Sequence, residues 1–137
     1  MREAAIELTE AMFEAFTARD VEAMIVLLDP DMEFYPIGTA RLTGSDAPYR
    51  GHDGMRRYFA DVDQVWQELR VVPQHYEVNA DRVLVIGRVY ARDRQGGVID
   101  SPAGWLWEIK DQRFVSGQVF DDPDEAHEAA AAAASEA

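Results

Sequence analysis

The chain has 137 residues, 47% of them apolar, which fits one globular domain with its own core. Its 13 basic and 26 acidic residues give a formal net charge of -13. Phosphate backbones and anionic lipid surfaces would repel such a chain, so we expect no nucleic-acid and no membrane partner. It has no cysteine, which excludes disulfides and thiolate metal sites and favours a cytoplasmic location.

The N-terminal half predicts two helices and a short strand. Leu8, Met12 and Phe16 recur at helical spacing over about residues 3–18. Asp20 is a predicted N-cap for a short second helix, which Pro30 stops. Residues 32–35 then predict a strand, and a loop rich in Gly, Thr, Ser and Pro follows from Pro36 to about Gly51.

A third helix is predicted over about residues 53–69, where apolar side chains recur at steps of four and three. Its stripe is Met55, Phe59, Val62, Trp66 and Leu69. Four strands follow, over about 71–78, 82–92, 97–109 and 113–120, and good turn sequences separate them. This order predicts an α+β fold in which a curved antiparallel or mixed sheet wraps around three N-terminal helices. Such a sheet can leave a cone-shaped internal pocket.

The last segment differs from the rest in composition. Residues 123–137 are Ala-rich and should be helical with a frayed end, and they follow a main domain at 1–122. From Asp121 onward there are six carboxylates and no Lys or Arg. We interpret this segment as a solubilising acidic tail; the alternative is a docking surface for a basic partner.

Four segments resemble those of a known family: 16–23 (FTARDVEA), 27–34 (LLDPDMEF), 49–54 (YRGHDG) and 114–121 (FVSGQVFD). With them the chain resembles the SnoaL-like branch of the nuclear transport factor 2-like superfamily, from about residue 6 to 126. The resemblance implies a cone-shaped fold with a deep apolar pocket, and a homodimer formed through the outer face of the sheet. These motifs are turn and packing signals, so they specify the fold better than the reaction.

The ketosteroid isomerases of this superfamily provide a test of the reaction. Their general base, an Asp, aligns with Tyr35, just before the Pro-Ile-Gly at 36–38. Their oxyanion-hole Tyr aligns with Met12, and their second donor, a protonated Asp, falls on or beside Trp105. Proton abstraction beside a ketone needs a carboxylate base and donors that face the oxyanion. The resemblance therefore implies that this chain lacks the isomerase mechanism.

Strand alternation gives the predicted directions of the side chains. If Tyr35 faces the cone, then so does Glu33, two residues earlier. The same alignment turns Ile86, Arg88, Tyr90 and Arg92 inward. It leaves the small, β-branched set on the outside, where it would form a dimer face: Val83, Val85, Gly87, Val89 and Ala91.

The predicted pocket is aromatic with a few polar groups, and the alternative is that its aromatic residues are simply core. Its predicted ligand-binding residues are Met12, Phe16, Tyr35, Tyr58, Phe59, Trp66, Tyr90, Trp105, Trp107, Gln118 and Phe120. We expect a small apolar or aromatic ligand there.

Glu33 and Arg88 are the predicted catalytic pair. Burial among aromatic residues would raise the pKa of Glu33 and suit it to acid–base work, while a nearby Arg would lower that pKa and could bind a substrate carboxylate or enolate. The family's epoxide hydrolases use an Arg between two acidic residues to activate water, and only the Arg has a counterpart here. The alternative is a structural Glu33–Arg88 ion pair.

The sequence contains no motif that predicts a metal site or a nucleotide-binding site. The three histidines, His52, His75 and His127, are far apart, and we expect no metal and no cofactor. His52 could reach a pocket mouth, although a His at a helix start is more often exposed. Two functions remain open: a cofactor-independent SnoaL-like cyclase, isomerase or hydrolase that acts on a polyketide-like substrate, or a non-catalytic binding domain. A third is an association domain that works through the sheet face and the acidic tail.

Overall fold

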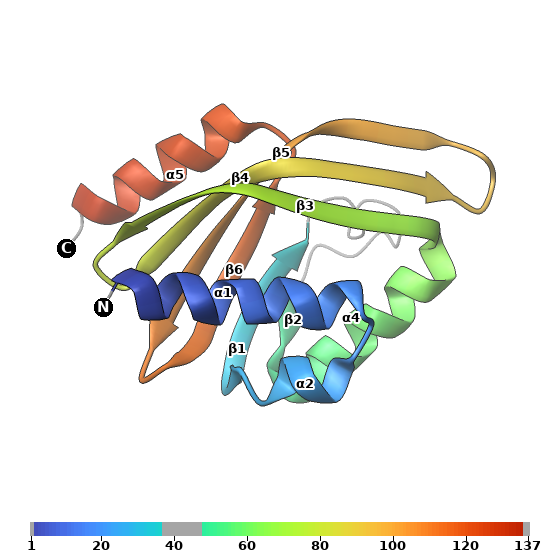
Figure 1. Cartoon of the computed structure of the whole chain (residues 1–137). Coiled ribbons are helices and arrows are strands. Elements are labelled where there is room, and N and C mark those ends of the chain that lie inside the picture. The colour runs from blue at the N-terminus through green and yellow to red at the C-terminus, as the bar shows by residue number, and fades with distance from the viewer. Residues whose placement is uncertain (1, 37–47, 136–137) are drawn as a thin grey trace.

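A six-stranded curved sheet is the framework of the domain (Figure 1). The computed structural model describes residues 2–36 and 48–135. Its described helices are α1 (Arg2–Thr17), α2 (Val21–Ile25), α4 (Gly51–Val65) and α5 (Pro123–Ser135). Its strands are β1 (Leu28–Pro36), β2 (Tyr49–Arg50), β3 (Trp66–Asn79), β4 (Arg82–Asp93), β5 (Val98–Lys110) and β6 (Arg113–Phe120). None of the described helices is long and apolar enough to cross a membrane.

The strands lie in the order β2-β1-β6-β5-β4-β3, in which β1 and β6 are parallel and all other neighbours are antiparallel. Helix α1 contacts β3 and β4, and α4 contacts β1 and β3, so both pack within the curve of the sheet (Figure 1). This arrangement confirms the predicted α+β fold with a mixed sheet that curves around N-terminal helices. The predicted loop after Pro36 falls largely at 37–47, outside the described residues.

Several element boundaries follow local signals of the sequence, but α2 ends at Ile25, and Pro30, which was predicted to stop it, lies within β1. The Asp20 carboxylate accepts the Ala23 N–H at 3.1 Å and caps α2, as predicted. The third helix is shorter than predicted, because the chain turns extended at Trp66 and pairs with β4 from Trp66 opposite Asp93. The long partner strand supplies hydrogen bonds that outweigh the helical spacing of Trp66 and Leu69.

The inner face of β4 is the small, β-branched set, so its predicted outward direction is wrong. Val83 lies opposite Trp107 and Val85 opposite Trp105, and both valines are 0% exposed. Large indole rings on β5 leave room only for small side chains beside them. The set that we predicted as a dimer face is therefore part of the core.

Helix α5 packs on the outer face of the sheet (Figure 1). Ala126 is 0% exposed and belongs to a second apolar cluster with Leu84 and Phe120. A Cβ atom on Gly104 would lie 2.5 Å from the Ala126 Cβ, so glycine is what lets the helix approach the strand this closely. The segment is helical as predicted, and its small alanines make it a packed element of the domain rather than the expected solubilising tail.

A homodimer through the outer face stays a prediction. The outer face that α5 leaves uncovered includes Val72, Arg88 and Tyr90 rather than the valines that we expected there. Analytical ultracentrifugation would measure whether the chain is a dimer.

Candidate functional site

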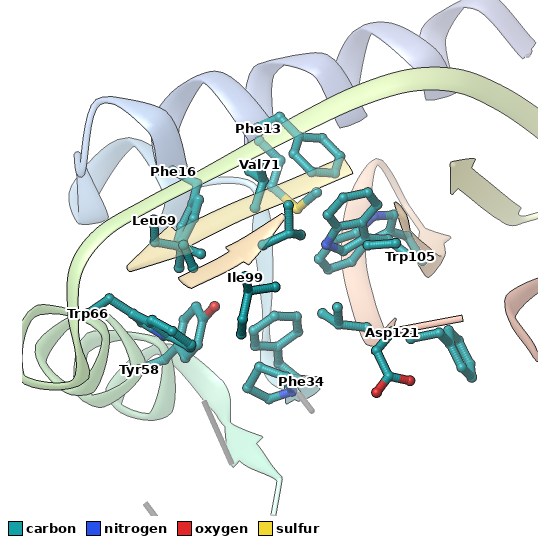
Figure 2. Close-up of a pocket in the computed structure, with 18 of the residues that line it drawn as sticks. Phe13, Phe16, Phe34, Tyr58, Trp66, Leu69, Val71, Ile99, Trp105 and Asp121 are labelled. Carbon is teal, nitrogen blue, oxygen red and sulfur yellow. The ribbon is translucent and has the colours of Figure 1, made fainter. Parts of the chain in front are cut away.

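An apolar cavity of about 370 Å³ lies between the helices and the inner face of the sheet (Figure 2). Helix α1 contributes Phe13 and Phe16, and α4 contributes Tyr58. Strands β3, β4 and β5 contribute the opposite wall, which includes Leu69, Val71, Val89, Ala91, Ile99, Ser101, Ala103 and Trp105. The volume suits a small organic molecule, because ligand pockets begin at about 300 Å³.

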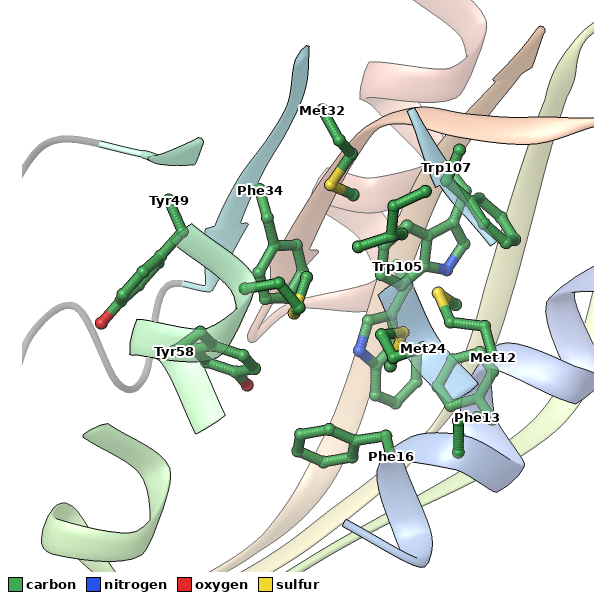
Figure 3. Close-up of a cluster of buried hydrophobic side chains, with 14 of the residues drawn as sticks. Met12, Phe13, Phe16, Met24, Met32, Phe34, Tyr49, Tyr58, Trp105 and Trp107 are labelled. Atoms are coloured by element: carbon green, nitrogen blue, oxygen red, sulfur yellow. The ribbon is translucent and has the colours of Figure 1, made fainter. Parts of the chain in front are cut away.

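Aromatic contacts hold the walls of this cavity (Figure 3). Phe34 stacks on Trp107 with 5.6 Å between ring centroids and 8° between planes. Phe13 meets Trp105 edge-on at 5.3 Å, and Phe16 stacks on Tyr58 at 5.9 Å. Such pairs stabilise by about 0.5–1.5 kcal/mol beyond the burial of their area, so they favour a rigid cavity wall.

Arg19 fixes the end of α1 that carries Phe16. Its guanidinium lies 4.2 Å over the Phe16 ring, donates to the Leu69 carbonyl oxygen at 2.7 Å and also donates to the Phe16 carbonyl oxygen. Burial lowers the pKa of Arg19 from its usual value, while Tyr58 and Asp63 oppose this effect. The contacts tie α1 to β3 across one margin of the cavity.

Few polar groups line the cavity. Among the lining residues that the structure describes there is no Lys, Arg, His or Glu, and the ionisable ones are Asp121 and Tyr58. Asp121 is exposed, and so marks the margin rather than the floor. The indole Nε1 of Trp107 is buried and has no hydrogen-bond partner within the described part of the chain.

The structure brings seven of the predicted ligand-binding residues together around the cavity. They are Met12, Phe16, Tyr58, Trp66, Trp105, Trp107 and Phe120. All three tryptophans of the chain are in this set.

The other four predicted ligand-binding residues do not line the cavity, and for Tyr35, Tyr90 and Gln118 the predicted inward direction is wrong. Tyr35 and Gln118 line a small depression on the outer face of the sheet. Tyr90, also on the outer face, has the Arg70 guanidinium 4.8 Å from its ring centroid. Phe59 packs edge-on against Phe16 at 5.6 Å, behind the cavity wall.

Glu33 and Arg88 do not form a pair and neither lines the cavity. The Glu33 carboxylate lies 2.9 Å from the Arg50 guanidinium, on the neighbouring strand β2. Arg88 pairs across strands with Asp100 at 3.1 Å. Phe34, between Glu33 and Tyr35, points inward and lies opposite Gly117, so strand alternation turns both of its neighbours outward.

Sequence reasoning missed several lining residues, among them Phe13, Phe34, Val89, Ala91 and Asp121. The sequence does contain a signal for the inward direction of two of these residues, Val89 and Ala91. Trp105 and Trp107 share a face of β5, and the facing positions of β4 had to be small to fit beside them. That requirement selects Val83 and Val85 as inward residues, and alternation along β4 extends the same direction to Val89 and Ala91.

The histidines give no metal site. The His52 Nε2 lies 3.1 Å from the Leu28 carbonyl oxygen, where α4 begins against β1, and its residue is half-buried. Over residues 2–36 and 48–135, no three His, Cys, Asp or Glu side chains form a group that could hold a metal ion.

The comparisons with known proteins assign the family. Residues 9–117 match the SnoaL-like domain family, so this chain belongs to it. The search of curated proteins found no match.

Solved structures share the fold at low sequence identity. An NTF2-like protein of unknown function from Burkholderia pseudomallei is 20% identical with a TM-score of 0.79, over 89% of this chain and 93% of that chain. TerC, co-crystallised with polyporic acid, is 24% identical with a TM-score of 0.78, over 91% and 96%. A provisionally named SnoaL-like polyketide cyclase from Jannaschia sp. CCS1 is 17% identical with a TM-score of 0.73, over 91% and 90%. At these identities the likeness defines an NTF2-like cone fold.

The outward position of the predicted catalytic pair leads to a testable result. We expect Glu33→Gln and Arg88→Gln to keep the dissociation constant of an apolar probe such as fluorene within about twofold of that of the unmodified protein. Neither side chain lines the cavity. Their ion pairs are largely exposed, so each loss should cost at most about 1 kcal/mol of folding free energy. Titration calorimetry of both variants checks this, and a tenfold weaker affinity in either variant would contradict the assignment of the cavity as the site.

Proposed function

We propose that this protein binds a small, largely apolar ring compound inside the cavity. The observation that carries the proposal is the aromatic cavity itself, with Phe13, Phe34, Trp105 and others around about 370 Å³ of space. The space opens to solvent near the exposed Asp121, and a partly open apolar space of this size is typical of a small-molecule site. Membership of the SnoaL-like family supports the proposal, as does TerC, a neighbour co-crystallised with polyporic acid.

Intrinsic fluorescence tests the proposal directly, because all three tryptophans line the cavity. Fluorene and 9-fluorenone are suitable probes, since both are rigid, planar and uncharged. We expect saturable quenching of tryptophan emission with a stoichiometry of one ligand per chain, confirmed by calorimetry. The absence of saturable binding for these two and for a wider panel of polycyclic compounds would contradict the proposal.

A second candidate function is acid–base catalysis of the polyketide cyclase kind, with Asp121 as the base. It is favoured by one observation: Asp121 is the carboxylate among the described lining residues. This replaces the hypothesis that Glu33 is the base. A carboxylate that reaches the α-carbon of a bound ketone can remove its proton.

Deuterium exchange tests this second function without knowledge of the natural substrate. If Asp121 acts as a base, the protein should accelerate exchange of the α-protons of 2-tetralone in D₂O, and Asp121→Asn should lower that acceleration at least tenfold while binding persists. Asp100→Asn, on the outer face of β5, is the matched control and should keep the acceleration. No acceleration by the unmodified protein, or full acceleration in Asp121→Asn, would exclude this role.

A further inference from the structure

Trp107 lines the cavity, and its buried indole N–H is a polar group that the contacts within the described residues do not explain. The Trp107 residue is 4% exposed, and its Nε1 has no acceptor among the residues described. A buried N–H without a partner costs about 1–3 kcal/mol, and nearly all such groups in folded proteins find one. The sequence could have placed phenylalanine here at no such cost, so the N–H itself calls for an acceptor.

The contacts of the Trp107 ring show where an acceptor can reach the donor. The benzo edge of the indole abuts Gly117, and a Cβ atom there would lie 2.1 Å from Cζ3 and 2.3 Å from Cε3. The ring carbon that bears Nε1 is diametrically opposite Cζ3, so Nε1 is on the edge turned away from β6. Figure 3 shows this nitrogen on the side of Met12, which also lines the cavity. Both Nε1 and Met12 are buried, so a ligand reaches this donor once Met12 changes rotamer, which an unbranched methionine does readily.

The chemistry of the wall restricts the kind of acceptor. A single neutral N–H cannot compensate an anion taken out of water, and the described lining residues offer no Lys, Arg or His to help. A carbonyl oxygen accepts one neutral hydrogen bond at little cost and can be part of a planar ring system. We propose that Trp107 is the hydrogen-bond donor of the cavity, and that the ligand of the cavity presents an uncharged carbonyl oxygen to Nε1. This proposal rests on the binding function proposed above.

Two ligands of nearly the same shape separate this hydrogen bond from the hydrophobic effect. Fluorene is more apolar than 9-fluorenone, so a cavity without a donor should prefer fluorene. A cavity with the Trp107 donor should prefer 9-fluorenone, by about fivefold from a hydrogen bond of ordinary strength.

Indole N–H resonances report the bond in the unmodified protein, because the chain has only three tryptophans. We expect 9-fluorenone to move the Trp107 indole proton downfield while fluorene does not. Trp107→Phe should reverse the preference to fluorene, and Tyr90→Phe on the outer face should keep the preference for 9-fluorenone. The spectra of the unmodified protein decide the question if Trp107→Phe fails to fold.

The outcomes distinguish this inference from the function on which it rests. A preference for 9-fluorenone together with its downfield shift supports both. Binding of the two ligands with equal affinity, or tighter binding of fluorene, without a distinct Trp107 shift would overturn the role of Trp107 and leave the binding function intact. Failure of both ligands and of the wider panel to bind would overturn both.

Discussion

Replacement of Gly117 by alanine should lower the free energy of unfolding by about 3 kcal/mol, the upper part of the usual range for an overpacked core. The new Cβ would lie 2.1–2.3 Å from two carbons of the Trp107 ring. That ring cannot move away freely, because Phe34 stacks on one of its faces and Phe114 meets it at 5.5 Å. For a domain of this size the change corresponds to a melting temperature about 10 °C lower. Urea denaturation and thermal melting measure both.

Gly97→Ala is the matched control for this prediction. Its added Cβ would meet the Asp93 carboxylate at 2.5 Å, but that is the end of a half-buried side chain whose hydrogen bonds from the Gln95 and Gly97 N–H groups are exposed in the β4–β5 turn. We expect a loss below about 1 kcal/mol there. Equal stability losses in the two variants would show that Trp107 is not held as tightly as its contacts indicate.

The order and type of most elements could be predicted because they have a local cause, but β2 (Tyr49–Arg50) lies within the predicted loop and was missed. Asp20 caps a helix, turn sequences such as that at 110–112 separate the strands, and the strands are long and β-branched. The end of α4 could not be found this way. Trp66 and Leu69 keep the helical spacing, yet pairing with β4 takes them into β3. That pairing joins residues more than twenty positions apart and has no local signal.

The candidate site was predicted in part, and its errors share one cause. Alternation shows which residues share a face of a strand but not which face is inside, and a shift by one reverses the whole strand. The direction of β1 was taken from Tyr35, which the resemblance aligned with a catalytic Asp. The direction predicted for β4 was aligned with that of β1, so Arg88 was wrongly predicted to face inward. Phe34 stacks on Trp107 at the core, and this contact sets the true direction of β1.

Most residues whose position did not depend on that choice were placed correctly. Phe59 is an exception, because it packs against Phe16 and does not line the cavity. Met12, Phe16 and Tyr58 lie on helices whose apolar stripes can face only the sheet. Trp105 and Trp107 are too large and apolar to lie on a polar outer face. For β4 the composition was ambiguous, since small β-branched residues suit a sheet interface and also the space beside large rings. Only the partner strand decides between these two.

The same alternation gives the sharpest test of the cavity. Ser101→Trp should weaken ligand binding at least tenfold, because Ser101 lies opposite Val89 on the inner face of β5 and lines the cavity. An indole is the largest side chain in proteins, so in a cavity of about 370 Å³ it leaves too little space for a tricyclic ligand. Calorimetry with fluorene measures the effect, and the circular dichroism spectrum and melting temperature show whether the fold persists.

Asp100→Trp places the same side chain one residue earlier, on the outer face of the strand. Asp100 is exposed and pairs only with the exposed Arg88 in the described structure, so the change should cost at most about 1 kcal/mol of stability. It should leave fluorene binding within about twofold. Because the two variants differ only by the period of two of a strand, loss of binding in Ser101→Trp alone would assign the ligand to the inner face. Loss in Asp100→Trp alone would assign it to the outer face and overturn the cavity as the site.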